Sequence, residues 1–242
     1  RFCRRPCLAL FLDFSKAFDR VWHPALLLSL AANGVAPWLT RLLSSYLTNR
    51  SFQVFFEGCF SCPRAAEAGV PQGSHLGPLL YDVYISDMPV LDEVRPWAYA
   101  DDLAFTAVSR DAPDRLQLML NLIERWATSK KMTVNVQKCA LMKAGAQVPI
   151  QLTLGGQRIP QTTRFKYLVL PVTPTLRPSV VINDRINKIR QLIPWAKRMR
   201  RFVHSPEIAV KLFKTYVLPV GEYGAPLSSL SPITHRRRYT SA

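Results

Sequence analysis

The sequence predicts an α+β fold, in which an antiparallel sheet backed by helices precedes a helical, basic C-terminal part. Apolar runs of strand length alternate with helical patterns over most of the chain. Two of these runs flank Asp101-Asp102, and turn-forming aspartates between such runs predict an antiparallel hairpin. Residues 177–242 hold 13 Lys and Arg against 3 Asp and Glu. We therefore expect two parts, residues 1–175 and residues 176–242.

The first fifty residues predict one buried strand and two helices. The run 8–12 is continuously apolar, which is typical of a central strand buried on both faces, and it ends at Asp13. Pro24 suits the first turn of a helix that ends before Gly34, and a second helix is expected over 37–47.

The remaining expected elements follow from the same patterns of apolar spacing, glycine and proline. Before the paired aspartates they are a strand over 51–57 broken by Gly58 and a loop over 69–78 that enters a helix over 79–87. After the hairpin around Asp101-Asp102 come a helix from Asp111, a strand over 139–143, a hairpin over 150–159 that turns at Gly155-Gly156, and a strand over 164–172. The last two are a helix over 182–202 with a kink at Pro194 and a helix over 208–218.

Three aspartates are candidates for a metal site. Asp13 follows a buried strand, where a carboxylate is costly unless a metal ion or hydrogen-bond donors satisfy it. Asp101 and Asp102 place two like charges side by side, which raises the pKa of each unless a cation lies between them. Mg²⁺ takes oxygen ligands, and two-metal phosphoryl transfer needs carboxylates from more than one segment. Asp13 is therefore the expected third ligand.

The loop from Gly69 to Pro78 is a candidate for ligand binding. Glycines let backbone approach a ligand closely, and the N-terminus of the helix that follows favours phosphate. The alternative is an ordinary junction between a loop and a helix.

Composition points to a polyanionic partner. Of 242 residues, 48% are hydrophobic, and 32 Lys and Arg against 16 Asp and Glu give a net charge of +16 and a pI near 10.1. This balance suits nucleic acid or an anionic membrane face, and the alternative is a solvated basic surface. No apolar run reaches the ~18 residues that span a bilayer, and the N-terminus lacks a signal-peptide pattern. We expect an intracellular fragment with no membrane partner.

The five cysteines leave two interpretations open. Cys3, Cys7, Cys59 and Cys62 have spacings that could form a four-thiolate zinc site. No histidine lies at finger spacing and Cys7 adjoins an apolar strand, which favours reduced, partly buried thiols.

Three stretches together resemble the reverse transcriptase of non-LTR (LINE-type) retrotransposons, most like the jockey-like elements of insects. They are Leu12-Asp13-Phe14-Ser15-Lys16-Ala17-Phe18-Asp19-Arg20-Val21-Trp22-His23, Gly69-Val70-Pro71-Gln72-Gly73-Ser74 and Tyr99-Ala100-Asp101-Asp102. Their starting points are about 56 and 30 residues apart, and the resemblance covers nearly the whole chain. It implies a polymerase palm over 1–175 and the start of a thumb over 176–242.

The resemblance also implies roles for single residues. Asp13 and Asp101 match the carboxylates that hold two Mg²⁺ ions, with Mn²⁺ as an alternative ion. Asp102 matches the neighbouring acid that supports these carboxylates, and Phe14 belongs to the same metal-binding set. Phe18 matches a steric gate that favours deoxynucleotides, and its alternative is core packing. Gln72 and Gly73 match the loop under the incoming nucleotide. Lys138 matches a lysine that assists the leaving pyrophosphate, and its alternative is a surface lysine.

The part downstream of residue 160 resembles nucleic-acid-binding elements of the family. Lys166-Tyr167-Leu168 resembles the primer-grip hairpin, although Val169 stands where the family usually has glycine, which a branched residue imitates poorly. Asp19 and His23 are assigned to local structure. The basic helices should contact phosphates regardless of sequence, through Arg185, Lys188, Arg190, Lys197, Arg198, Arg200 and Arg201.

The resemblance implies RNA-templated DNA synthesis, with dNTPs added to the 3′-end of a DNA primer or target. It implies a nuclear location and a cytoplasmic ribonucleoprotein, and the sequence leaves the oligomeric state open. One alternative is a truncated remnant that lacks the upstream fingers and only binds nucleic acid. The other is an interaction protein with no nucleic-acid role, which the basic C-terminal part disfavours.

Overall fold

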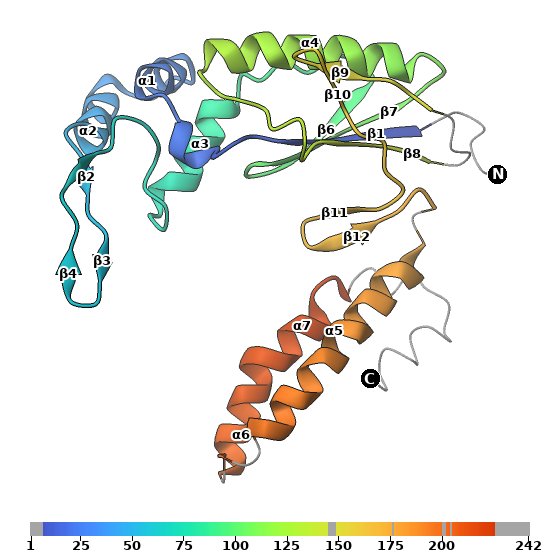
Figure 1. Ribbon diagram of the computed structural model, residues 1–242. Coiled ribbons are helices and arrows are strands. Elements are labelled where there is room, and N and C mark those ends of the chain that lie inside the picture. Colours follow the sequence, from blue (N-terminus) through green and yellow to red (C-terminus); the bar gives the residue numbers. More distant parts are fainter. Residues whose placement is uncertain (1–6, 145–148, 176, 200–201, 204, 226–242) are drawn as a thin grey trace. The chain divides into compact units, whose positions relative to one another are not determined.

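The computed structural model describes residues 7–144, 149–175, 177–199, 202–203 and 205–225. Arg200 and Arg201 lie outside the described residues. The chain forms two compact units, Arg1–Gln161 and Thr162–Ala242 (Figure 1). The hairpin expected to grip the primer therefore groups with the helices that follow it, although the sequence placed it in the first part.

The first unit is built on a four-stranded antiparallel sheet in the order β6-β7-β1-β8. Strand β1 (Cys7–Asp13) lies between β7 (Asp102–Val108) and β8 (Ala140–Ala144), and β6 (Val94–Tyr99) is an edge strand. The expected central strand and the hairpin around the paired aspartates are thus present, and β8 begins one residue after the expected start.

Helix α4 (Ala112–Ser129) covers one face of this sheet and contacts β1 and β7. The other helices of this unit are α1 (His23–Ala32), which packs against both α2 (Pro37–Leu47) and α3 (Leu76–Ile85), and the short 3₁₀ helix η1 (Phe18–Arg20). Helix α4 runs along the sheet in Figure 1, and its fully buried Leu116, Met119, Leu120 and Ile123 join Leu10 of β1 in the core. The helical spacing of these side chains is therefore a packing signal, as the sequence suggested.

Helix α3 starts earlier than predicted. It begins at Leu76 rather than residue 79, because the Ser74 hydroxyl accepts a hydrogen bond from the Gly77 amide at 2.9 Å and so stabilises an extra turn. It ends at Ile85.

A buried polar network ties three of the helices together. The Lys130 ammonium donates to the Ser29 hydroxyl of α1 at 2.7 Å and pairs with Asp87, after α3, at 2.8 Å. The Trp126 indole of α4 donates to the same carboxylate at 3.0 Å, and the Tyr84 hydroxyl of α3 donates to the Lys130 carbonyl. Lys130 itself is 7% exposed, whereas the Asp87 side chain is 53% exposed, so the network runs from the buried ammonium group to the solvent surface.

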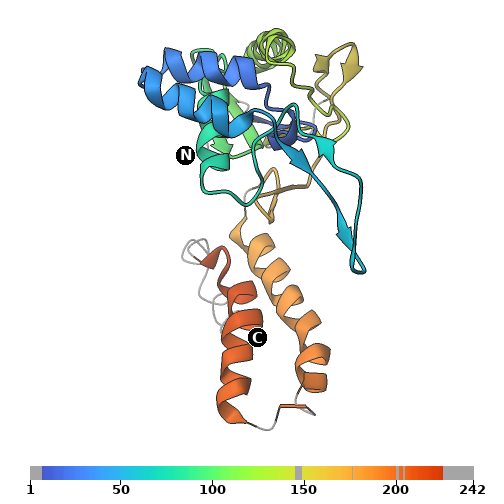
Figure 2. The ribbon, with the colours of Figure 1, turned by 90° about the vertical axis from the view of Figure 1, so that its left-hand side faces the viewer.

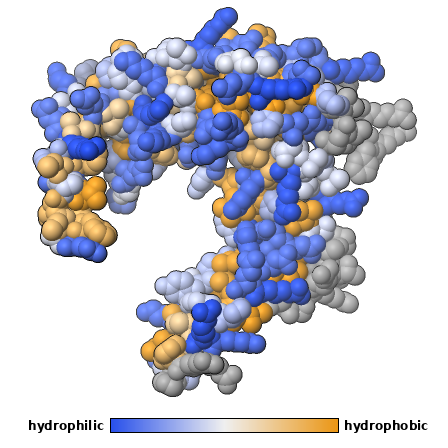
Figure 3. Space-filling view, viewed as in Figure 1, coloured by the Kyte–Doolittle hydropathy of each residue, from blue (hydrophilic) through white to orange (hydrophobic). Residues whose placement is uncertain are grey.

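Residues 51–65 form a hairpin and not the single strand that the sequence predicted. Its strands are β2 (Ser51–Phe52), β3 (Phe55–Phe56), β4 (Cys59–Phe60) and β5 (Arg64–Ala65), and the chain reverses at Glu57 and Gly58, both with positive φ. Figure 2 shows the hairpin extending away from the helices of this unit, and Figure 3 shows that apolar atoms cover much of it. Phe55 and Phe60 contact each other with ring centroids 4.8 Å apart.

The described cysteines do not support the zinc alternative. Cys59 and Cys62 are exposed in the hairpin, Cys7 is half-buried on β1, and Cys139 is buried beside β8. Cys3 lies outside the described residues. Burial raises the pKa of the Cys139 thiol to about 11, so this side chain stays protonated.

The first unit ends with a second hairpin, β9 (Thr153–Leu154) and β10 (Gln157–Arg158). It turns at Gly155 and Gly156, as predicted, and both glycines have positive φ. The Gln117 side chain of α4 exchanges two hydrogen bonds of 2.9 Å with the Thr153 backbone and so fixes the hairpin.

The second unit consists of a hairpin and two helical arms. The expected single strand over 164–172 is instead the hairpin β11 (Phe165–Tyr167) and β12 (Leu170–Val172). Helix α5 (Pro178–Met199) continues through Pro194. The second arm is α6 (Pro206–Leu212), the π-helical segment η2 (Phe213–Val217) and α7 (Leu218–Glu222). The two arms lie side by side in Figures 1 and 2. The rings of Trp195 and Tyr216 pack against each other between the arms, with their centroids 5.7 Å apart.

No helix within the described ranges is long and apolar enough to cross a membrane.

Candidate active site

The three predicted aspartates lie at one end of the sheet. Asp13 is the last residue of β1 and pairs directly with Asp102, the first residue of β7. Tyr99 pairs with Asp102 on the other side, so Ala100 and Asp101 form a two-residue loop in which Ala100 has φ +53°. Directly opposed residues of antiparallel strands point to the same face. Asp13 and Asp102 therefore share the face opposite the helices, since their neighbours Leu12 and Leu103 belong to the core.

The electrostatics of this end favour a cation. Burial raises the pKa of Asp102, and the nearby charges of Asp101 and Asp13 raise it further. The buried Oδ2 of Asp13 finds no hydrogen-bond partner among the described residues. Among the described residues, the Lys138 ammonium forms an ion pair with that oxygen, at 3.7 Å.

The donor set fits a hard divalent ion that is completed by substrate. The part of the chain that the structure describes holds no ready-made cage of three Asp, Glu, His or Cys side chains. Mg²⁺ is commonly held by one or two carboxylates together with waters and substrate phosphates, so a closed cage is not required. The Phe14 ring is 3% exposed and packs against Trp126, so the group of this residue that could serve as a ligand is its backbone carbonyl.

Lys138 is brought to the aspartates by a loop that is fixed to the end of β1. The Asn135 amide donates to the Asp13 carbonyl and the Ser15 amide to the Thr133 carbonyl, both at 2.8 Å. The Lys138 side chain is 68% exposed and bonds no other described carboxylate, which leaves it able to reach a bound anion.

Phe18 packs against another aromatic ring and is at the same time partly exposed to solvent. Its ring stacks on Tyr81 of α3, with centroids 4.5 Å apart and planes inclined by 24°, and the side chain is half-buried. Tyr81 is fully buried, and its hydroxyl has no hydrogen-bond partner within the described ranges. Burial, followed by the charge of Asp101, raises the pKa of Tyr81, so its hydroxyl stays protonated.

The Gly69–Pro78 loop is fastened to the segment that carries Phe18. The Gln72 side-chain amide donates to Asp19 Oδ1 at 2.8 Å, and His23 Nε2 lies 2.9 Å from the Gly69 carbonyl. Gly69 has φ +88°, and a Cβ there would lie 2.9 Å from the Asp19 backbone, so only glycine fits. Gly73, in contrast, has open space around it, and its φ of +79° is what favours glycine.

Asp19 and His23 thus connect two motifs, whereas the sequence assigned them to local structure. The Asp19–Gln72 contact joins residues 53 positions apart, and no local pattern signals it. Tyr81 was missed for a similar reason, because a buried aromatic on an apolar helix reads as ordinary core.

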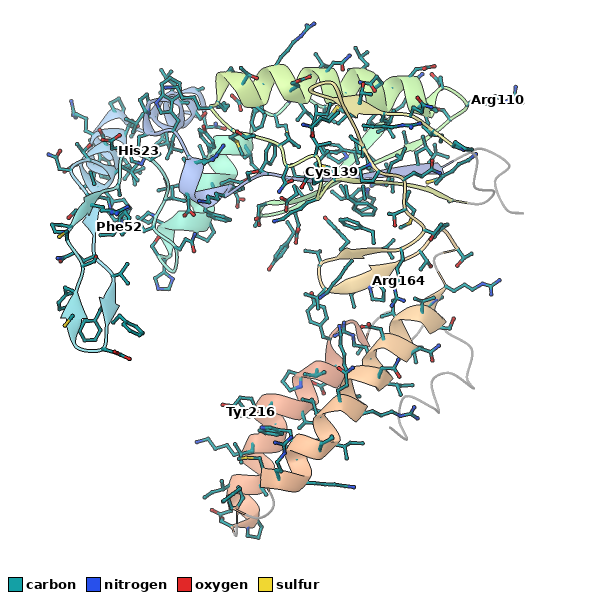
Figure 4. All side chains as sticks on the ribbon, viewed as in Figure 1. His23, Phe52, Arg110, Cys139, Arg164 and Tyr216 are labelled. Carbon is teal, nitrogen blue, oxygen red and sulfur yellow. The ribbon has the colours of Figure 1, made fainter. Side chains whose placement is uncertain are left out.

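The predicted primer-grip residues lie on the hairpin of the second unit. Lys166 and Tyr167 are on β11, and Leu168 is in the turn. A groove of about 270 Å³ is lined by residues of the hairpin and of α5, among them Arg164, which Figure 4 labels. Its charged lining residues are the basic Arg164, Lys166 and Lys188 and the single acid Asp184, so the groove has an excess of positive charge.

The basic residues of α5 that were expected to bind nucleic acid differ in how accessible their side chains are. Arg190, Lys197 and Arg198 are exposed, and Lys188 pairs with Asp184 at 2.9 Å. Arg185 needs a correction: it is 4% exposed and donates to the Val169 carbonyl at 3.0 Å, so it supports the hairpin from inside.

An antiparallel sheet that presents paired carboxylates at the end of a central strand, with basic elements after it, is the plan of a nucleotidyl-transferring polymerase core. Residues 3–172 match the family described as reverse transcriptase (RNA-dependent DNA polymerase), and the chain belongs to this family. The expected resemblance to non-LTR retrotransposon enzymes is confirmed by the relatives that follow.

Several curated relatives come from mobile elements of Drosophila. The RNA-directed DNA polymerase from mobile element jockey of Drosophila funebris is 34% identical over 246 residues, which cover 93% of this chain and 26% of the relative. The probable RNA-directed DNA polymerase from transposon X-element of Drosophila melanogaster is 32% identical over 247 residues, covering 96% and 27%. The chain thus spans about a quarter of the length of these relatives.

Solved structures agree on the fold. Apo telomerase from Candida tropicalis, truncated from its C-terminal domain, aligns with a TM-score of 0.52 and 15% identity, covering 71% of this chain and 35% of that chain. Likeness at this identity shows the fold alone, and it confirms the expected mixed architecture of a polymerase palm.

Proposed function

We propose that this chain carries the nucleotidyl-transfer site of an RNA-directed DNA polymerase. The observation that carries the proposal is the register of the sheet, which sets Asp13 opposite Asp102 and puts Asp101 in the adjoining turn. The unpartnered Asp13 oxygen and the raised pKa of Asp102 support a cation at this place. Two bound Mg²⁺ ions, or Mn²⁺ in their place, would activate a primer 3′-hydroxyl and neutralise a leaving pyrophosphate.

The residues around the aspartates have matching tasks. Asp13 and Asp101 hold the ions and Asp102 supports them from the adjacent strand. Lys138, whose ammonium is 3.7 Å from Asp13, stabilises the leaving pyrophosphate. Phe18 presents an aromatic ring where a ribose 2′-hydroxyl would lie, and its stacking on Tyr81 keeps the ring from yielding. Gln72 and Gly73 bind the incoming dNTP.

The partners of the site are an RNA template, a DNA primer or target, and dNTPs. The Candida tropicalis telomerase solved with a fragment of telomeric RNA, at 13% identity and a TM-score of 0.52, shares the fold and supports this choice of template. In the second unit, the hairpin around Lys166 and the exposed cations of α5 bind the phosphate backbone. The palm and thumb divide functionally near residue 175, and the parent element acts in the nucleus and in a cytoplasmic ribonucleoprotein.

Primer extension on an RNA template with dNTPs and Mg²⁺ tests the proposal. Asp101→Asn removes one carboxylate charge from the site, and we expect it to abolish extension, a loss of at least about 100-fold. RNA affinity should stay within about twofold, because the phosphate contacts lie elsewhere. Asp92→Asn, which removes an exposed carboxylate outside the site, is the matched control and should extend normally.

The same experiment distinguishes an active polymerase from the alternative, a catalytically incomplete remnant. No extension by the unmutated chain, with RNA binding intact, would assign it a binding role only. Equal loss of extension and RNA binding in Asp101→Asn would instead contradict the separation of site and binding surface.

A further inference from the structure

The turn of the β11–β12 hairpin has a backbone that its residues do not favour. Tyr167 pairs with Leu170, which leaves Leu168 and Val169 as a two-residue loop. Their φ angles are +47° and +66°. Positive φ at both central residues is the turn that Asn-Gly sequences prefer, and a β-branched residue in this region is a clear outlier. Such a conformation persists only where its surroundings hold it.

Both carbonyl groups of this turn are held by side chains from the helical arms. The Tyr223 hydroxyl donates to the Leu168 carbonyl at 2.8 Å. The Arg185 guanidinium of α5 donates to the Val169 carbonyl at 3.0 Å. The two contacts reach the turn from positions 55 and 16 residues away, so local sequence does not supply them.

The two holding residues also hold each other. The Arg185 guanidinium carbon lies 5.4 Å from the centroid of the Tyr223 ring, a cation–π distance. Asp184 pairs with the same guanidinium at 3.0 Å. Arg185 is 4% exposed, and its Nε has no hydrogen-bond partner in the described part of the chain, so an arginine is buried here although its donors are not all used.

We propose that Arg185 and Tyr223 form a clamp that holds the Leu168–Val169 turn in its left-handed conformation and thereby positions the hairpin for a primer phosphate backbone. The proposal rests on the proposed function. Val169 lines the basic groove together with Lys166 and Lys188, so a change in the turn alters the shape of that groove. Arg185 and Tyr223 are positioning residues, since they act through the turn and not on the primer itself.

The clamp is tested in two steps: one substitution deletes a hydrogen bond to the turn, and a second one relieves the backbone strain that the hydrogen bond offsets. Tyr223→Phe deletes the donor to Leu168, and we expect the KM for primer–template to rise about fivefold while kcat and the KM for dNTP stay unchanged. Val169→Gly relieves the strained position, so Val169→Gly/Tyr223→Phe should return the KM to within about twofold. Arg185→Lys, which keeps the charge but loses the planar fork, should behave like Tyr223→Phe.

Tyr216→Phe is the matched control, because Tyr216 lies on the same arm and is 55% exposed (Figure 4). It should leave every parameter unchanged. Unchanged primer affinity in Tyr223→Phe, or failure of Val169→Gly to restore it, would overturn the clamp.

A second readout keeps the clamp separate from the proposed function. Anisotropy of a labelled primer–template duplex reports affinity without any synthesis, and it should show the same loss and rescue. If the unmutated chain binds the duplex but extends nothing, the proposed function fails while the clamp is still judged by this series. If Tyr223→Phe binds as the unmutated chain does, the clamp fails whatever the extension assay shows.

Discussion

Asp19 shows how a single hydrogen bond can determine the orientation of another side chain, here the amide of Gln72. An ionised carboxylate only accepts hydrogen bonds, so the Gln72 atom 2.8 Å from Asp19 must be the amide nitrogen. The orientation of the amide follows from this chemistry and needs no choice between two similar atoms. The Gln72 carbonyl oxygen is then the atom left to face a ligand. We expect it to accept a hydrogen bond from the incoming nucleotide.

This contact leads to a prediction about non-additive substitutions. Asp19→Ala should raise the KM for dNTP about tenfold, in line with ~1.5 kcal/mol for a hydrogen bond to a charged group. Gln72→Ala should do the same, and Asp19→Ala/Gln72→Ala should be no worse than either, because Asp19 acts through Gln72. Steady-state kinetics with Asp92→Ala as control gives the comparison. Effects that simply add would show that Asp19 acts on its own.

Residues whose positions follow from local pattern could be found from the sequence, and those whose environment depends on long-range contacts could not. A carboxylate after a buried strand and two carboxylates in a tight turn mark Asp13 and Asp101-Asp102, since strand ends and turns are local features. The burial of Arg185 depends on a hairpin sixteen residues away, and a basic residue on a basic helix gives no sign of it.

At the scale of elements, the Lys130 network joins α1, α3 and α4. Burial raises the pKa of Asp87, but the hydrogen bonds from Lys130 and Trp126 outweigh it and leave the pKa below its ordinary value. A pKa that is lower in the folded chain means that folding favours the ionised carboxylate. The resulting stability is present above the ordinary pKa of about 4 and is lost as the pH falls through the folded-state value.

We therefore predict an acid-sensitive fold that depends on Asp87. The free energy of unfolding in urea should fall between pH 5 and pH 3 in the unmutated chain, and it should fall less steeply in Asp87→Asn. Asp114→Asn, an exposed acid in the first turn of α4, serves as the control. Parallel pH curves for the unmutated chain and Asp87→Asn would exclude the carboxylate as the cause.

Most elements were predictable, and the two main errors have separate causes. The hairpin at Gly155-Gly156 and the helix over Pro37–Leu47 follow from glycine and proline positions. Two hairpins were mistaken for single strands, over 51–57 and 164–172, because the second reverses at Leu168-Val169, a pair with no turn preference. The first conceals its return strand in the short segment 59–65 that follows Gly58.

At the scale of the whole chain, charge is distributed unevenly. The chain carries +16, and the residues from 177 onward supply +10 of it. Phosphate binding releases counterions, so the logarithm of RNA affinity should fall linearly with the logarithm of salt concentration. The exposed cations of α5 should account for part of that slope.

A double substitution tests this assignment. Lys197→Gln/Arg198→Gln should reduce the salt slope by about two and weaken binding equally for unrelated RNA sequences. Arg110→Gln/Arg125→Gln removes the same charge from two exposed positions, one just before α4 and one within it, and it should change the slope less. Filter binding from 50 to 200 mM salt gives both slopes. Equal changes in the two variants would assign binding to net charge and not to α5.

The division into two compact units also depends on contacts that the sequence does not display. Composition changes near residue 175, which is where the expected boundary was placed. The hairpin before that point is held by Arg185 and Tyr223, so it groups with the helical arms.

The register between β1 and β7 has a last consequence, for refolding. Side chains alternate between the two faces of a strand, so a slip of one residue would turn Asp102 toward the helices and Leu103 outward. Such a molecule could keep its sheet and most of its circular dichroism, yet it could no longer set Asp102 beside Asp13. Titrating the fraction of competent active sites after refolding would then count the molecules whose strands paired correctly, which spectroscopy of secondary structure does not distinguish.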